Sequence, residues 1–404
     1  MVPKPWRAAA YAFIVLPVSA CGQPSSSPDA VGTPEVWAAE PDLRVGSVQG
    51  DDALTWFRSL QISGDGRIYT LHPMEQTVRV FAADGSQLGR IGGEGDGPGE
   101  FKNAFGMGWL ADTLWVLDGN GYRFNLFNAE GQFLSSFTVP FEIGTDMNAP
   151  NPPRASALLF DGTVFGAPPA FSSQIADGTL TEYVPMLMNR AGNVTDTLPG
   201  IPFGRNQWAI SDPDGRQVGG MYTRQPYADG PLWGFARAER AILRLDREAS
   251  DQTQNASFQL TKLSFAGDTL FSLSFGYEPI PVSQVEADSI LDAMTTSLVD
   301  RGFRGLSALE ARTWAEHGFY RPAFRSPIAG MVLGRDGTIW LAEAGLDPTT
   351  KSWLVLNAAG EGIGRVLLPS HFNVAAADRT AVWGSETDDL DVTYLRRFRI
   401  RQPE

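Results

Sequence analysis

A short unit recurs six times along the chain, and this repetition constrains the fold more than any other feature of the sequence. Each copy begins with an apolar stretch, continues through a tight turn usually spelled Asp-Gly, and ends in a stretch carrying Tyr, Trp or Phe. The copies start at Leu60, Gly106, Ala157, Gln225, Met331 and Val374. Because Asp-Gly between alternating apolar positions is a strong signal for a β-hairpin, the repeat predicts an all-β protein of six similar units.

A second hairpin pattern follows most copies of the first. It consists of an apolar strand, a turn ending in Gly and a final strand, at residues 78–91, 124–137, 185–198 and 353–366. Two hairpins give each unit four antiparallel strands, and one such sheet cannot bury both of its faces. Six sheets around a common axis can, since each packs on the next, so the sequence predicts a six-bladed β-propeller.

The two ends of the chain complement one another. After residues 392–400 the sequence stops without a fourth strand for the last unit, and residues 42–48, "DLRVGSV", can supply that strand. We therefore expect the N-terminal strand to close the last blade. The predicted propeller spans residues 42–401, with insertions in blades four and five.

The repeated units resemble the NHL-repeat type of six-bladed β-propeller, in particular bacterial propeller lipoproteins of largely unassigned function. The resemblance is carried by the six strand-turn-aromatic units, by the hairpins "FAADG" and "FNAEG", and by "GEGDGPGEF", where the family has a Gly-rich crossover between blades. It covers about residues 42–401. It specifies the fold well and the ligand hardly at all.

Residues 91–101, "IGGEGDGPGEF", are rich in both glycine and acid. A strand and not a helix is expected to follow them, which argues against a phosphate-binding loop. The favoured interpretation is a crossover from blade one to blade two, because Gly and Pro match the demands of turns. The alternative is a Ca²⁺ site formed by Glu94, Asp96 and Glu100, since Ca²⁺ prefers oxygen ligands.

Residues 279–323 depart most from the regular blades. Ser283 precedes Glu286 by three positions and Ser307 precedes Glu310 by three, which is the spacing of a capping box at a helix N-terminus. Two short helices are therefore expected between blades four and five. They would cover part of the propeller or form a wall of its pocket, and a partner-binding role is the alternative.

The N-terminus has the anatomy of a secretory leader over residues 1–20. Two basic residues precede an apolar run that is too short to span a bilayer, and "VSA" precedes Cys21. The small residues before the cysteine resemble the lipobox of bacterial lipoproteins, which implies acylation of Cys21 and, because Gly22 follows, the outer membrane. Ordinary cleavage that leaves a free thiol is the alternative. Residues 21–41 then form a flexible linker to the propeller.

The composition limits the possible functions. A formal net charge of −14 argues against a nucleic-acid partner, which would require clustered Lys and Arg. The chain has one cysteine and three histidines, His72, His317 and His371, which we expect on the surface or in loops. No Ser lies in a G-x-S-x-G elbow, so no carrier for nucleophilic acyl transfer is visible.

Ligands of propellers usually bind on the face formed by the turns after each blade's second strand. The candidate ligand-binding residues in these turns are Glu75, Asp118, Asn120, Tyr122, Arg237, Arg240, Glu343 and Asp347. Glu343 and Asp118 each end a strand and are best placed to face the central channel. A solvated charged rim is the simpler interpretation of the same residues. Trp115, Trp233, Trp340 and Trp383 occupy equivalent second-strand positions and are assigned to packing between blades.

Two functions remain open from the sequence. The favoured one is a non-catalytic binding or scaffold module in the cell envelope that recognises a peptide, a protein or a glycan, without a cofactor. The alternative is a metal-dependent hydrolase or lyase, because propeller lactonases resemble this fold and bind a divalent ion, Ca²⁺ or Zn²⁺, with Glu, Asn and Asp. The scarcity of histidine and the lack of a nucleophile and base at catalytic spacing favour the first.

Overall fold

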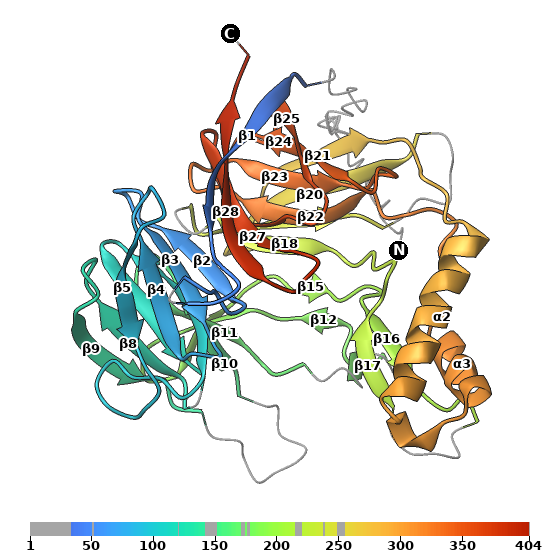
Figure 1. The fold of residues 1–404 in the computed structure, drawn as a ribbon, viewed down its shortest axis with the longest axis horizontal. Coiled ribbons are helices and arrows are strands. Elements are labelled where there is room, and N and C mark those ends of the chain that lie inside the picture. The colour runs from blue at the N-terminus through green and yellow to red at the C-terminus, as the bar shows by residue number, and fades with distance from the viewer. Residues whose placement is uncertain are drawn as a thin grey trace, which may run out of the picture.

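The computed structural model describes residues 34–403 except 51, 120, 142–151, 171–173, 176–177, 215–219, 237–238 and 249–254. The leader, Cys21, Asn120 and Arg237 therefore lie outside the described residues. The described chain is built almost entirely of small antiparallel sheets, with two helices late in the sequence (Figure 1). The expected all-β class is confirmed.

Four sheets have four strands each. The first contains β2 (Ser59–Ile62), β3 (Ile68–His72), β4 (Thr77–Phe81) and β5 (Gln87–Gly92), and the second contains β6 (Ala104–Leu110), β7 (Thr113–Asp118), β8 (Arg123–Phe127) and β9 (Phe133–Thr138). The third contains β10 (Arg154–Leu158), β11 (Val164–Ala167), β13 (Met186–Met188) and β14 (Val194–Thr197), and the fourth contains β18 (Leu232–Ala236), β19 (Ala241–Asp246), β20 (Ser257–Ser264) and β21 (Thr269–Gly276). Most of these hairpins follow the repeated pattern of the sequence.

The remaining large sheet has eight strands and joins two four-stranded halves. The fifth four-stranded unit consists of β22 (Ile328–Leu333), β23 (Ile339–Glu343), β24 (Thr350–Leu356) and β25 (Gly362–Pro369). The sixth consists of β26 (Asn373–Ala377), β27 (Ala381–Thr387), β28 (Thr393–Arg401) and, from the N-terminus, β1 (Val36–Val45). The two halves meet where β1 pairs with β25.

β1 is the predicted N-terminal closing strand. It runs antiparallel to β28, and the expected pairing is present at Leu43, Arg44 and Val45, which lie opposite Arg397, Arg396 and Leu395. The strand starts earlier than expected, because Val36 to Pro41 also belong to it although the sequence placed them in the linker. Trp37 explains the difference, since its buried indole packs between the fifth and sixth units.

The sheets pack face to face in cyclic order. Buried apolar side chains join each four-stranded unit to the next, and a further cluster joins the sixth back to the first. Each cluster contains residues of two neighbouring units, such as Val78 with Met107, Phe124 with Leu158, Phe165 with Ile242, Phe258 with Ile339, Trp340 with Val382, and Trp383 with Leu60. This is the organisation of a β-propeller, in which each sheet hides its face on a neighbour.

The fourth sheet differs from its prediction. Residues 232–236 were assigned to the second strand of a unit starting at Gln225, but they form the first strand, β18, and β19 follows. The misleading signal was Asp229-Gly230, which does not form a hairpin turn. The Asp229 carboxylate is buried and accepts a hydrogen bond from Tyr320. Trp233 is consequently not equivalent to Trp115, Trp340 and Trp383, and it stacks on Tyr183 with a centroid separation of 5.1 Å.

Two helices lie between β21 and β22, at α2 (Gln284–Asp300) and α3 (Ala308–His317), with a short 3-10 turn η2 (Phe303–Gly305) between them. Ser307 and Glu310 form the expected capping box. Ser283 also caps its helix by accepting the N–H of Glu286, but the Glu286 side chain does not return the bond and pairs with Arg325. No helix in the described part of the chain is both long and apolar enough to cross a membrane.

The helices pack on a two-stranded sheet that the sequence did not predict. It consists of β16 (Gln207–Ile210) and β17 (Met221–Arg224), and a second small sheet pairs β12 (Glu182–Tyr183) with β15 (Ile201–Pro202). Trp208 and Trp314 lie in the shared apolar cluster, and the Trp208 indole donates to the Ala315 carbonyl at 2.8 Å. We call β16, β17, α2 and α3 the cap, which stands beside the sheets in Figure 1.

The Gly-rich segment carries the chain from β5 to β6. Gly92, Gly95 and Gly99 have positive φ values of 82°, 159° and 80°. The segment closes on itself because the Phe101 N–H donates to the Gly93 carbonyl, and it is fixed by the fully buried Phe101 ring. The Glu100 carboxylate accepts the Gly97 N–H at 2.8 Å.

Candidate functional site

Glu75 lies in the turn between β3 and β4, as expected, but its carboxylate is already engaged. It accepts from Arg79 at 2.7 Å and from the Thr55 hydroxyl at 2.7 Å, and Arg90 lies 3.4 Å away. Burial alone would raise the pKa of Glu75, but the hydrogen bonds from Arg79 and Thr55 and the Arg79 charge hold it below its ordinary value. Glu75 therefore neutralises the buried Arg79 and is poorly placed to bind a ligand.

His72 was expected at the surface or in a loop, and this is wrong. Its ring is fully buried at the end of β3. The burial is tolerated because the two ring nitrogens form hydrogen bonds with the hydroxyls of Thr55 (2.9 Å) and Thr70 (2.8 Å). Burial lowers the pKa of His72 to about 4, and the Arg79 charge adds to this effect. The other two histidines, His317 and His371, are exposed, as expected.

Acidification should destabilise the protein through His72. An unfolded histidine protonates near pKa 6.5, whereas folded His72 protonates only near pH 4. Its contribution to stability is therefore complete above pH 6.5 and is lost as the pH falls from 6.5 towards 4. Between about pH 7 and about pH 5, we expect the free energy of unfolding of the wild type to fall roughly 1–2 kcal/mol more than that of a His72→Gln variant, by urea denaturation. The control is exposed His371→Gln, and equal pH dependence of wild type and His72→Gln would contradict the prediction.

Asp118 and Tyr122 also have structural roles. The buried Asp118 carboxylate accepts the backbone N–H groups of Lys102 (3.2 Å) and Asn103 (3.0 Å) and pairs with Arg123 at 3.3 Å. It therefore holds the end of the Gly-rich segment against β7. Tyr122 packs on Phe141 with a centroid separation of 5.1 Å.

Arg240 and Asp347 both interact with neighbouring side chains. Because β18 is a first strand, Arg240, which directly precedes β19, lies at the opposite end of its sheet from the turn expected to bind ligand. Arg240 accordingly pairs with Asp161, in the Asp-Gly turn between β10 and β11. Asp347 is exposed, and hydrogen bonds from Thr349 and Thr350 hold its pKa well below the ordinary range.

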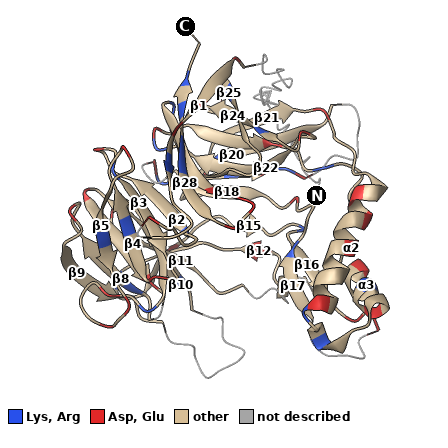
Figure 2. Ribbon diagram, viewed as in Figure 1, with Lys and Arg blue, Asp and Glu red and all other residues tan. Residues whose placement is uncertain are grey.

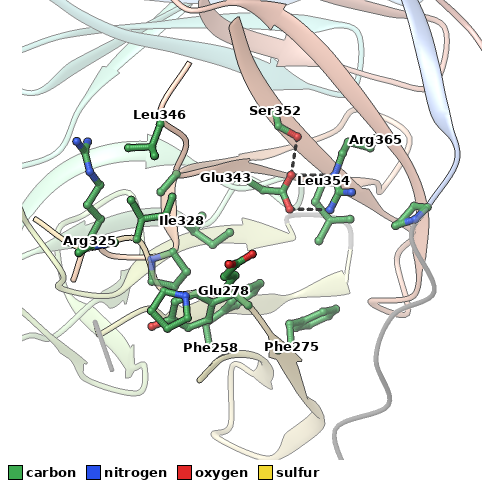
Figure 3. Close-up of a pocket in the computed structure, with 18 residues that line it drawn as sticks. Phe258, Phe275, Glu278, Arg325, Ile328, Glu343, Leu346, Ser352, Leu354 and Arg365 are labelled. Carbon is green, nitrogen blue, oxygen red and sulfur yellow. Dashed lines mark hydrogen bonds and ion pairs between the residues drawn. The ribbon is translucent and has the colours of Figure 1, made fainter. Parts of the chain in front are cut away.

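Glu343 is a described candidate that lines a large cavity. This outer pocket has a volume of about 990 Å³ and lies between the fourth sheet and the fifth unit (Figure 3). The Glu343 carboxylate accepts from Arg365 Nη2 at 2.8 Å, from Arg365 Nε at 2.9 Å and from the Ser352 hydroxyl at 2.5 Å. Apolar walls are contributed by Phe258, Phe275, Tyr277, Ile328, Leu346 and Leu354.

An inner pocket of about 500 Å³ adjoins the outer one. The two share Arg325, Glu343 and Ala344, so together they form one elongated site, which we call the groove. The cap forms one wall of the inner pocket through Glu286 and Ile290 of α2 and Arg224 of β17. The opposite wall includes Gly345 and Lys351.

Arg247 forms part of the floor of the inner pocket and is only 3% exposed. Its guanidinium donates to the carbonyls of Gly230 (2.8 Å) and Ile328 (2.7 Å), and it forms no ion pair with a described residue. Burial, together with the neighbouring Arg224, lowers the pKa of Arg247 to about 10. The group thus remains charged at neutral pH.

The basic residues of the groove were missed by sequence reasoning. Arg224, Arg247, Arg325 and Lys351 lie far apart along the chain and outside the repeated turns. The fold of the cap and the position of the fourth sheet bring them together. The one usable signal was "RPAFRSP" at 321–327, a Pro- and Arg-rich segment directly after the predicted helices.

The chemistry of the groove suits binding. Among the described residues that line it there is no His or Cys, and Ser352 already donates to Glu343, whose charge Arg365 balances. Within the described ranges, no three His, Cys, Asp or Glu side chains are grouped so that they could hold a metal ion. A further cavity of about 640 Å³ lies among β2, β6, β18, β22 and β26, where Lys262 pairs with Glu239.

No family model matches the chain, and no curated protein matches it. Among solved structures, it is similar to a putative exported protein from Bacteroides fragilis, with 10% identity, 90% of this chain and 96% of that chain covered, and a TM-score of 0.46. It is also similar to a member of the DUF4221 family from Bacteroides vulgatus, with 13% identity, 92% of this chain and 98% of that chain covered, and a TM-score of 0.42. A third similar structure is virginiamycin B lyase from Staphylococcus aureus, with 10% identity, 89% of this chain and 99% of that chain covered, and a TM-score of 0.41. These identities and TM-scores are too low to transfer an activity.

Proposed function

We propose that this protein is a six-bladed β-propeller that acts as a non-catalytic binding or scaffold module for a peptide, protein or glycan. The six blades correspond to the six four-stranded units, and cyclic packing supports this count. The cap is inserted around blade four, with β16 and β17 before it and the helices after it. The repeated hairpins support assignment to the NHL-repeat type.

The proposed location is the cell envelope, with the protein anchored through an acylated Cys21. The leader sequence supports export, and Gly22 favours the outer membrane, facing either the periplasm or the outside. Pro34 lines the outer pocket, so the linker from Cys21 joins the folded protein beside the groove. Twelve residues separate Cys21 from Pro34, and a flexible linker of that length has an average span of about 20 Å. The groove would therefore lie close to the membrane.

The observation that carries the proposed function is the groove itself. A binding module requires a preformed concave site with apolar walls and a few polar groups, and the two adjoining pockets have this composition. The alternative, a metal-dependent hydrolase or lyase of lactonase type, requires carboxylates that are free to bind a cation. Glu75, Asp118, Glu343 and Asp347 each accept hydrogen bonds from protein groups instead.

Gly345→Trp should block the groove without unfolding the protein. A Cβ at Gly345 would meet no atom within 4 Å, and the residue lines the inner pocket. We expect the full-length protein in detergent to bind members of a random peptide pool or a glycan array, and the variant to bind them at least about tenfold more weakly. The matched control is Gly64→Trp, which also meets open space but lies in the turn between β2 and β3.

Two results would count against the proposed function. One is equal binding by Gly345→Trp and Gly64→Trp, which would place the ligand elsewhere. The other is stoichiometric, tightly held Ca²⁺ or Zn²⁺ in the purified protein, measured by elemental analysis, which would favour the metal-dependent alternative.

A further inference from the structure

We infer that the groove binds the C-terminal end of a peptide, with the free carboxylate in the inner pocket and the preceding apolar side chains in the outer pocket. This inference rests on the proposed function and specifies its ligand. Three features of the described residues carry it: the charge of the inner pocket, the unused donors in it, and the different character of the outer pocket.

The inner pocket is basic in an acidic protein. Arg224, Arg247, Arg325 and Lys351 line it, against Glu286 and Glu343. The chain as a whole has a formal net charge of −14, and acidic residues are frequent along α2 and α3 and at the turns in Figure 2. A local excess of cations favours the binding of an anionic group in this pocket. The acidic surface around it repels anions, so the pocket is the preferred place for one.

Several donors in the inner pocket lack partners. Arg224 and Lys351 form no ion pair with any described residue, so their charges are available to a ligand. Arg325 donates through Nη2 to Glu286 at 2.6 Å, but its Nε is buried and has no acceptor. Because a buried unsatisfied N–H is costly, an acceptor atom supplied by a ligand at this position would stabilise the complex.

Arg247 provides a second source of positive charge below these donors. Its carbonyl partners fix the guanidinium but do not neutralise it, since carbonyls carry no formal charge. The charge of the nearby Asp229 carboxylate acts on Arg247, but no described acid forms an ion pair with it. A carboxylate in the inner pocket would therefore lie near a buried cation whose charge is only partly balanced, where water screens the attraction poorly. We assign Arg247 a positioning and electrostatic role, without direct contact to the ligand.

The outer pocket requires a different chemical group. The charges of its lining residues balance, because Arg325 and Arg365 are matched by Glu278 and Glu343. Glu278 faces the cavity in Figure 3. Glu278 repels a carboxylate from this end, so the anion belongs in the inner pocket. The apolar residues Tyr277 and Leu346 extend the outer pocket, and Leu346 is 72% exposed.

The aromatic residues distinguish a peptide from a glycan. Sugars bind by stacking on open aromatic faces, but Phe258 and Phe275 are each only 5% exposed and stack on one another at 5.2 Å. Their small exposed area favours contact with an apolar side chain over stacking with a sugar ring. The adjoining pockets also suit an extended ligand with distinct groups at successive positions, which a peptide chain provides.

The test uses two matched pools of random octapeptides, one with free C-terminal carboxylates and one with C-terminal amides. Each pool is passed over the immobilised full-length protein in detergent, and retained peptides are identified by mass spectrometry. We expect the free-acid pool to be retained at least about tenfold more strongly, with apolar residues enriched before the C-terminus, since the amide removes the charge.

Charge-reversal variants identify the pocket involved. Lys351→Glu and Arg224→Glu should each lower retention of the free-acid pool about tenfold or more, whereas Lys351→Arg should retain it. The control is Lys102→Glu, a reversal at an exposed residue near the second sheet, with folding of every variant checked by circular dichroism.

The possible outcomes separate this inference from the proposed function. Equal retention of acids and amides that Gly345→Trp abolishes would overturn the carboxylate inference and leave the binding groove intact. Binding of a glycan array through the groove, without peptide binding, would do the same. Retention of nothing from either pool or from the array would overturn both proposals.

Discussion

Deletion of residues 34–45 is expected to cause the largest loss of stability of any short deletion in this protein. β1 forms antiparallel pairs with β28 and a short parallel contact with β25, and it buries Trp37 and Leu43. Burial of each of these side chains contributes roughly 1.5–3 kcal/mol. Together with the lost strand pairing, the deletion should remove at least about 5 kcal/mol, which is comparable to the whole stability of many domains.

The measurement is thermal unfolding followed by circular dichroism, with loss of a cooperative transition or a large fall in Tm as the expected result. Deletion of residues 402–404, which follow β28, is the control and should leave Tm unchanged. A synthetic peptide spanning residues 34–46 should partly restore the transition when added to the truncated protein. Unchanged Tm after the deletion would show that β1 does not close the structure.

Phe101→Ala is expected to be the most damaging single substitution in the Gly-rich crossover. The ring is fully buried, packs on Phe127 with a centroid separation of 6.1 Å, and joins the apolar cluster between the first and second sheets. Truncation of a buried phenylalanine costs about 3–5 kcal/mol, because it removes apolar contacts and leaves a cavity.

Urea denaturation measures this effect, and Phe105→Ala is its control. Phe105 lies four positions later in β6 and is 40% exposed, so its loss should cost less than about 1 kcal/mol. Similar losses for the two variants would contradict the assignment of the crossover as a tightly packed element. The ring also explains the glycine at position 92, since a Cβ there would lie 2.0 Å from Phe101.

The parts of the fold that could be predicted are those specified by local signals. Asp-Gly turns between alternating apolar residues located the hairpins β2–β3, β10–β11 and β22–β23, and the spacing of Ser307 and Glu310 located a helix start. The closing strand was found because the last unit lacked a strand. The prediction placed its start too late, since Pro41 and the acidic residues before it looked like linker, whereas the burial of Trp37 depends on contacts with distant strands.

The failures occurred where distant contacts override a local signal. Asp229-Gly230 has the spelling of a hairpin turn, but Tyr320 and Arg205, both distant in sequence, bind its carboxylate. That single error moved Trp233 and Arg240 to the wrong positions. Glu343 was the one described candidate found in the groove, because it ends a regular strand, whereas Lys351 and Arg247 could not be placed before the relation of the cap to the sheets was known.

The position of β1 has a mechanical consequence. Its hydrogen bonds to β28 run perpendicular to the strand direction. A pull on the N-terminal end along the strand loads these bonds in shear, so that they resist together, whereas a perpendicular pull would break them one after another. With the proposed N-terminal anchor, tension directed along β1 would act on the pairing of β1 with β28, which closes the cyclic packing of the sheets.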